Sequence, residues 1–141
     1  MLYGIGTDVC AISRMAAAVQ RHGERFAQRV LGPSELAEYR RRLAKVERRG
    51  IHYLATRFAA KEAFSKSIGL GIHDPMRWRD CEVLKLPSGQ PVIVLHHALK
   101  AWCEARALRF MVSVSDEADT ALAMVVAEVA PPAASSLAHT P

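Results

Sequence analysis

The chain has 141 residues, of which half are hydrophobic and 23% are charged, so it can bury one substantial core and has the balance of a globular protein. No apolar run approaches the roughly 18 residues of a membrane span, and the N-terminus lacks the pattern of a secretion signal, which predicts a cytoplasmic protein outside the membrane. The formal charge of +5 favours an anionic partner, which can be nucleic acid, a nucleotide or an acidic protein.

The first third of the chain is predicted to be a strand followed by helices. Residues 2–9, LYGIGTDV, form an apolar segment typical of a strand, and Gly4 and Gly6 allow another backbone to approach closely. The helices expected next are 13–22 with Ser13 as its cap, 24–31, and 35–48 with Ser34 as its cap and Gly50 as its end.

The stretch 57–69, RFAAKEAFSKSIG, is predicted to belong to the central helix of the chain. Its alanines, lysines and glutamate favour a helix, which we expect to start near residue 51 and to end at Gly69. Its large apolar residues can fill the buried side; they are Phe58, Phe64 and Ile68.

Charged side chains recur on this helix at spacings of four residues, which places them on common faces. Glu62 and Lys66 set a carboxylate beside an ammonium, and Arg57 and Lys61 add an adjoining strip of cations. Such a surface suits a hard metal ion and a phosphorylated substrate. A solvated helix with one ordinary Glu–Lys pair explains the same pattern.

The second half of the chain is predicted to contain two hairpins. The elements expected there are a loop over 70–79, strands over 81–86 and 92–95 with a turn at 87–91, a helix over 96–107, strands over 110–115 and 120–129, and a disordered tail over 130–141. Because strands and helices do not alternate strictly, this order predicts an α+β fold, with one domain over residues 1–129, rather than a doubly wound parallel sheet.

Asp8 is a second acidic position that stands out, because it ends an apolar strand. Asp8 and Glu62 can converge on one cation, and Mg²⁺ takes few protein carboxylates, keeps several waters and accepts phosphate oxygens. Asp8 can instead cap the helix that follows it. Asp116, Glu117 and Asp119 are expected to form the turn of the last hairpin.

Several other chemistries lack their motifs. There is no GxxxxGK[ST], no HExxH and no GxSxG, and Gly4-Ile5-Gly6 lacks the third glycine of a dinucleotide fingerprint. Three widely spaced cysteines without a CxxC pair exclude a disulfide framework and a zinc knuckle, which leaves reduced thiols.

Two segments together resemble the signatures of the 4′-phosphopantetheinyl transferases of the short bacterial type. They are Gly4-Ile-Gly-Thr-Asp8 and Arg57-Phe-Ala-Ala-Lys-Glu-Ala-Phe-Ser-Lys66. Weaker likeness at 25–31, 34–36, 112–115 and 121–126 extends the resemblance over roughly residues 2–128. The resemblance implies an antiparallel-rich sheet packed against a long central helix.

The resemblance also implies a reaction, in which the 4′-phosphopantetheine arm of coenzyme A moves to a serine of an apo acyl carrier protein and adenosine 3′,5′-bisphosphate is released. The implied site residues are Asp8 and Glu62 for Mg²⁺, Lys66 beside the reacting phosphate, Arg57 and Lys61 for the coenzyme's phosphates, and Ser88, Gly89, Gln90 and Pro91 around the nucleotide. Lys66 would stabilise charge or protonate the leaving oxygen, and Glu62 or a water on the metal would serve as the base for the serine.

Partners follow from the same resemblance. Acyl carrier proteins are acidic, so a basic surface with one apolar contact would suit them; the candidate residues are Arg14, Met15, Arg21 and Arg25. The short members resemble one half of longer transferases in which two halves form one site, so the implied assembly is a homotrimer with sites between subunits.

One segment departs from the family pattern, since Ser115-Asp116-Glu117 stands where many members have Ser-His-Thr. Asp116 can replace that histidine at the nucleotide or touch nothing. The sequence is also compatible with two other functions. A specialised carrier of secondary metabolism can be the substrate, and the arginines at 40–42 and 48–49 would suit a nucleic-acid-binding module, although 6% aromatic residues and the lack of a binding motif speak against it.

Overall fold

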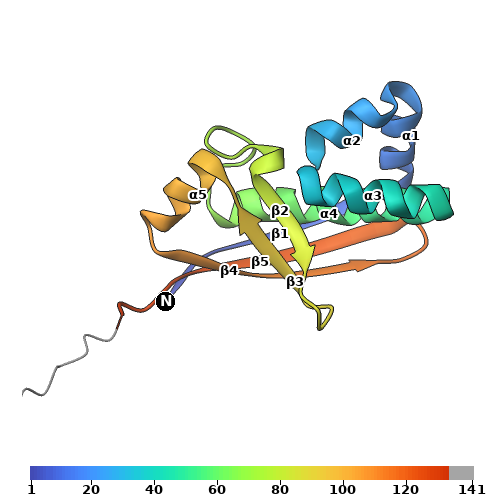
Figure 1. Ribbon diagram of the computed structural model, residues 1–141. Coiled ribbons are helices and arrows are strands. Elements are labelled where there is room, and N and C mark those ends of the chain that lie inside the picture. Colours follow the sequence, from blue (N-terminus) through green and yellow to red (C-terminus); the bar gives the residue numbers. More distant parts are fainter. Residues whose placement is uncertain (134–141) are drawn as a thin grey trace, which may run out of the picture.

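The computed structural model describes residues 1–133 and confirms the α+β prediction (Figure 1). Its elements are, in order, β1 (Leu2–Ala11), α1 (Ile12–His22), α2 (Glu24–Val30), α3 (Pro33–Lys45), α4 (Glu47–Ser67), the 3₁₀ turn η1 (Trp78–Asp80), β2 (Cys81–Lys85), β3 (Pro91–Leu95), α5 (His97–Glu104), β4 (Leu108–Asp116) and β5 (Thr120–Val129). Both expected hairpins are present, as β2–β3 and β4–β5.

A three-stranded antiparallel sheet forms one layer, and α4 lies along one of its faces (Figure 1). The strand order is β1-β5-β4, so β1 and β4 are the two edges. The central strand β5 turns small buried side chains toward α4, which lets the helix approach the sheet closely; they are Ala121, Ala123, Val125 and Ala127. The other face of the sheet exposes large apolar side chains, namely Ile5, Val9, Met111, Leu122 and Met124.

The glycines of β1 are where the sheet and α4 come closest. A Cβ atom on Gly4 would lie 2.0 Å from the carbonyl oxygen of Ser67, and one on Gly6 would lie 1.8 Å from that of Ala63. The expected close backbone approach is therefore confirmed. Because side chains alternate along a strand, Asp8 faces the same side as these glycines and is carried against α4.

Gly50 does not end a helix, which corrects the expected boundary between α3 and α4. The break falls at Val46, and α4 starts at Glu47 rather than near residue 51. A Cβ atom on Gly50 would lie 2.7 Å from Leu43 Cδ1, so the glycine permits α3 and α4 to pack tightly at their junction. Close packing, which depends on the neighbouring helix, overrides the usual helix-ending tendency of glycine.

The expected serine caps are also wrong. Ala11 and Gly32 are the N-cap residues of α1 and α3, and neither helix has its N-cap position filled by Ser13 or Ser34. The start of α3 is satisfied by carboxylates instead: Glu35 accepts from the Gly32 amide at 3.0 Å. Glu82, a residue of β2, accepts from the amides of Ser34 and Glu35 at 2.9 and 3.1 Å.

The described chain ends shortly after β5. The amide of Ala130 donates to the carbonyl of Ala107 at 2.7 Å, and residues 130–133 form no helix or strand. The rest of the expected tail, residues 134–141, lies outside the described residues. Across residues 1–133, no helix combines the length and the apolar character required to cross a membrane.

Candidate active site

Asp8 and Lys66 meet at the β1 edge of the sheet. The Lys66 ammonium donates to the carbonyl of Thr7 at 2.9 Å and lies 3.4 Å from Asp8 Oδ1. The Lys66 side chain remains 53% exposed, so it stays accessible to a ligand. Asp8 does not cap α1, because the N-cap of that helix is Ala11 and makes no side-chain capping bond, so the alternative capping role is wrong.

Glu62 belongs to the same cluster. Partial burial raises the pKa of the Glu62 carboxyl, and the nearby Asp8 carboxylate raises it further, whereas the charges of Lys66 and Arg14 lower it. Two carboxylates from a strand and a helix therefore repel each other in a half-buried setting. A hard divalent cation relieves that repulsion, so the donor set fits a metal ion.

Mg²⁺ is compatible with this donor set. No cluster of three or more metal-ligating His, Cys, Asp or Glu side chains occurs within residues 1–133. A metal held by Asp8 and Glu62 would consequently take its other ligands from water or a substrate, which is the usual situation of Mg²⁺ beside a phosphate.

Lys61 does not lie on an exposed strip of cations, which corrects the expectation from helical spacing. Its side chain is fully buried. The ammonium contacts Glu35 Oε1 at 2.5 Å and donates to the carbonyls of Val30 and Trp78 at 2.7 and 2.9 Å. These three acceptors occupy its three protons, so we assign Lys61 a structural role instead of the phosphate-binding role expected from the sequence.

Arg57 is likewise part of the packing, although it reaches a cavity. It is 4% exposed, its Nε donates to the Val83 carbonyl at 3.1 Å, and its guanidinium lies 4.3 Å from the centre of the Tyr53 ring. Burial lowers the pKa of this guanidinium. Arg57 therefore forms one wall of a cavity and is not a free surface cation.

Two adjoining cavities, which we call the basic groove, lie beside α3, the first half of α4 and the end of β4. One has a volume of about 320 Å³, the other about 850 Å³, and both are lined by Arg42, His52 and Asp116. The smaller adds Arg57, Lys85, Gly89, Pro91 and Ser113, and the larger adds Arg41, Lys45, Arg48, Arg49 and Glu117.

The expected turn at 88–91 contributes to this groove in part. Gly89, at φ +89°, and Pro91, the first residue of β3, line its wall. Ser88 and Gln90 are exposed at the tip of the same hairpin, where the Gln90 amide donates to the Ser88 hydroxyl at 3.4 Å. His52 and Lys85 were not expected from the sequence. His52 lies four residues after Arg48, which also lines the groove, and this is a signal that helical spacing could have supplied.

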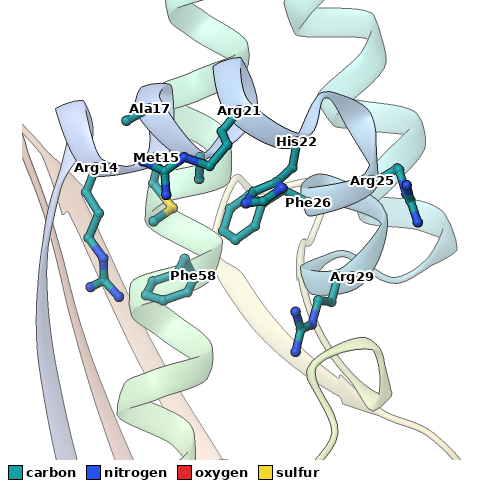
Figure 2. A pocket seen from close by; sticks show the side chains of 10 residues that line it. Arg14, Met15, Ala17, Arg21, His22, Arg25, Phe26, Arg29 and Phe58 are labelled. Atoms are coloured by element: carbon teal, nitrogen blue, oxygen red, sulfur yellow. The ribbon is translucent and has the colours of Figure 1, made fainter.

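A third hollow of about 850 Å³, which we call the helical groove, lies between α1, α2 and α4 (Figure 2). Its rim carries four arginines and one histidine, namely Arg14, Arg21, Arg25, Arg29 and His22. Phe58 contributes to its wall, with the Arg14 guanidinium 5.2 Å from the ring centre. Met15 is 1% exposed and belongs to the floor, so its expected role as a protruding apolar contact is corrected to that of a core residue.

Comparisons with known proteins agree with this architecture. The chain matches the 4′-phosphopantetheinyl transferase superfamily over residues 4–124. It is 61% identical to the holo-[acyl-carrier-protein] synthase of Leptothrix cholodnii over 128 residues, which are 91% of this chain and 97% of that protein.

Two solved structures are similar throughout. The holo-[acyl-carrier-protein] synthase of Neisseria meningitidis has a TM-score of 0.83 at 40% identity, covering 91% of this chain and 99% of that one. The Helicobacter pylori synthase in complex with coenzyme A has a TM-score of 0.73 at 31% identity, covering 88% and 99%. The chain thus belongs to the 4′-phosphopantetheinyl transferase superfamily. Within it, the similarity is to holo-[acyl-carrier-protein] synthases.

Proposed function

We propose that this protein transfers the 4′-phosphopantetheine arm of coenzyme A to a serine hydroxyl of an apo acyl carrier protein of fatty acid synthesis. The serine oxygen forms a bond to phosphorus, the bond from that phosphorus to the bridging oxygen of the diphosphate breaks, and the serine proton is released. Adenosine 3′,5′-bisphosphate leaves. The observation that carries the proposal is the meeting of Asp8, Glu62 and Lys66 at one edge of the sheet.

The carboxylate end of the site would hold Mg²⁺ through Asp8 and Glu62. When bound, the ion supplies neutralisation of the diphosphate charge, which is a major demand of phosphoryl transfer. The two side chains come from β1 and α4, and the glycine contacts between these elements make their separation rigid. A rigid pair of ligands favours one orientation of the diphosphate over others.

Lys66 would stabilise the negative charge that develops on the reacting phosphate and protonate the leaving oxygen. It lies 3.4 Å from the Asp8 carboxylate, which is longer than a strong ion pair, and half of its side chain faces solvent. The ammonium can therefore turn toward a phosphate oxygen without breaking a buried network. Glu62, whose carboxyl has a raised pKa, or a water on the metal would take the serine proton.

The basic groove would hold the nucleotide end of coenzyme A. Its arginines and Lys85 match the charge of the phosphates, and Gly89 and Pro91 line the smaller of its two cavities. In this arrangement Arg57 shapes the wall and stays fixed by Val83 and Tyr53.

We further propose that one complete site needs two copies of the chain, in a homotrimer. The carboxylate cluster lies on the β1 edge and the basic groove on the β4 edge, with α4 between them. Arg57 and Glu62 are five residues apart on α4, so they project about 140° from each other. A coenzyme molecule would reach both regions more directly across a junction between subunits.

The exposed apolar face of the sheet supports this assembly. Ile5, Val9, Met111, Leu122 and Met124 are 41–65% exposed, and such a patch is typical of a protein interface. Sedimentation should give three times the 15.5 kDa chain mass, and Met111→Asp should lower both assembly and activity. An active protein that sediments only as a monomer would contradict the shared site.

The helical groove would receive the carrier protein. Its rim of arginines is complementary to an acidic helix and lies next to the catalytic cluster, because Arg14 is within electrostatic reach of Glu62. Charge complementarity should raise the association rate and make it sensitive to salt. We place the enzyme in the cytoplasm, in keeping with three buried cysteines that are all free thiols.

The test is mass spectrometry of an apo acyl carrier protein after incubation with this protein, coenzyme A and Mg²⁺. We expect a mass gain equal to one phosphopantetheine, located on a serine. Carrier proteins of fatty acid synthesis and of secondary metabolism, compared side by side, identify the preferred substrate. If no carrier gains mass under conditions in which an established synthase modifies it, the proposal is wrong.

A further inference from the structure

A carboxylate–imidazole pair connects α4 to the end of β4 inside the basic groove. His52 Nδ1 lies 2.7 Å from Asp116 Oδ2, across 64 positions of sequence. The His52 side chain is 13% exposed and that of Asp116 43%, so the histidine is largely covered and the carboxylate lies on its solvent side. The pair thus joins two elements that are far apart in the sequence.

The other imidazole nitrogen is also occupied, and this determines the direction of the hydrogen bonds. Arg48 Nε donates to His52 Nε2 at 3.4 Å. A nitrogen that accepts from arginine carries no proton in the neutral ring, so Nδ1 carries it and donates to Asp116. The chain of donors runs from Arg48 through His52 to Asp116.

Arg48 is thereby left with its terminal nitrogens available. Across residues 1–133, its guanidinium makes no hydrogen bond or ion pair besides the bond to His52. It stands one helical turn before His52 on α4 and lines the basic groove. A guanidinium held at Nε with two free terminal N–H₂ groups is suited to grip a phosphate.

The negative charge of Asp116 needs an explanation, since it lies among Arg41, Arg42 and Arg48 in a groove suited to anions. By charge alone, a carboxylate here would weaken phosphate binding. Its hydrogen bond to His52 supplies the reason for its presence, because it prevents the imidazole from turning and releasing Arg48.

We propose that Asp116 is a positioning residue for coenzyme A: it orients His52, and His52 in turn orients Arg48 toward the phosphate groups at the nucleotide end of the coenzyme. The inference rests on the proposed function and assigns a role to the acidic turn that departs from the family pattern. Asp116 itself does not contact the coenzyme.

Asp116→Asn and Glu117→Gln each remove one negative charge from adjoining positions of the same turn, and they make a matched pair. If charge alone matters, both variants bind coenzyme A more tightly. If Asp116 positions His52, Asp116→Asn replaces a charge-assisted hydrogen bond with a weaker neutral one and raises the KM for coenzyme A roughly three- to ten-fold. Glu117→Gln leaves that KM equal to or below the wild-type value, because no hydrogen bond joins Glu117 to the histidine.

Steady-state kinetics with saturating apo carrier protein separate KM from kcat. We expect kcat of Asp116→Asn to stay within about two-fold of wild type, because the carboxylate cluster lies on the opposite edge of the sheet. Asp116→Glu should recover most of the affinity. In a His52→Ala background, Asp116→Asn should raise KM no further, since its effect passes through the imidazole.

A wild-type protein that modifies no carrier protein refutes the proposed function itself. An active wild type whose Asp116→Asn variant has an unchanged or lower KM for coenzyme A refutes only the positioning role. Additive effects of His52→Ala and Asp116→Asn on KM would refute it as well, because they would mean that Asp116 acts independently of the histidine.

Discussion

Lys61 and Lys66 stand five residues apart on one helix, and their surroundings differ completely. The Lys61 side chain is fully buried and its ammonium is within hydrogen-bonding distance of three acceptors, from α2, α3 and η1. The Lys66 side chain is 53% exposed, with one carbonyl and one distant carboxylate as partners. The same ionisable group thus serves the fold at one position and remains available for chemistry at the other.

The difference teaches that accessibility, rather than residue type, separates structural from catalytic cations. A buried ammonium must have all its protons bonded and its charge paired, which leaves nothing for a substrate. An exposed ammonium beside a carboxylate loses little when it changes partners. Substitutions along α4 and in β1 should therefore divide into those that affect activity and those that affect stability.

Glu62→Gln should have the largest effect, on activity. Losing one of two metal-binding carboxylates should lower the transfer rate by on the order of a thousand-fold or more. The unfolding temperature should stay equal or rise, because the repulsion between Glu62 and Asp8 disappears. Mass spectrometry of the carrier protein and thermal unfolding measure the two quantities. A folded Glu62→Gln protein with wild-type rate would exclude the metal assignment.

Lys61→Met should affect stability most. It leaves the buried Glu35 carboxylate without its cation, which costs about 3–5 kcal/mol in the free energy of unfolding. Urea denaturation measures the loss, with Lys66→Met as the matched control at below about 1 kcal/mol. Adding Glu35→Gln to Lys61→Met should restore part of the stability. Similar losses in both lysine variants would contradict the division between the two positions.

Lys66→Met should slow the reaction by on the order of a hundred-fold while the protein remains folded. The reason is that the ammonium acts on charge that develops during transfer and contributes little to packing. We expect the effect in kcat, with the KM values for coenzyme A and the carrier protein changed only slightly. A variant that loses affinity for coenzyme A at unchanged kcat would indicate a binding role instead.

The pH dependence of stability should show the smallest effect. The folded pKa of Glu62 is raised above its usual value of 4.5, so the folded state binds its proton more tightly than the unfolded state. The protonated Glu62 carboxyl therefore contributes its full stabilisation below the usual pKa of 4.5, and this stabilisation is lost as pH rises through the folded pKa. Metal-free thermal unfolding across this range, compared between wild type and Glu62→Gln, measures it. As pH rises through this range, the unfolding temperature of Glu62→Gln should fall less, or rise more, than that of wild type. Identical pH profiles for the two proteins would contradict the raised pKa of Glu62.

Much of the fold follows from local pattern. The alternation in β4 and β5 and the turn at 87–91 identify both hairpins, because period-two burial and turn residues are local properties. The boundary between α3 and α4 does not follow, since Gly50 is accommodated by its contact with Leu43. The capping of α3 by Glu82 could not be predicted either, because the carboxylate comes from β2, 48 positions away.

Some features of the candidate site likewise follow from the sequence, and others depend on tertiary contacts. The sequence by itself determined which residues carry charge, which of them share a helix face, and that Asp8 belongs to the first strand, although that strand continues to Ala11. Only the tertiary structure decided that Lys61 is buried, that Lys66 reaches Asp8, and that His52 meets Asp116. The reason is that 15 of the 21 residues of α4 are buried, so several other elements cover the helix on most sides. Helical spacing gives the angle between two side chains, whereas their exposure depends on segments distant in the chain.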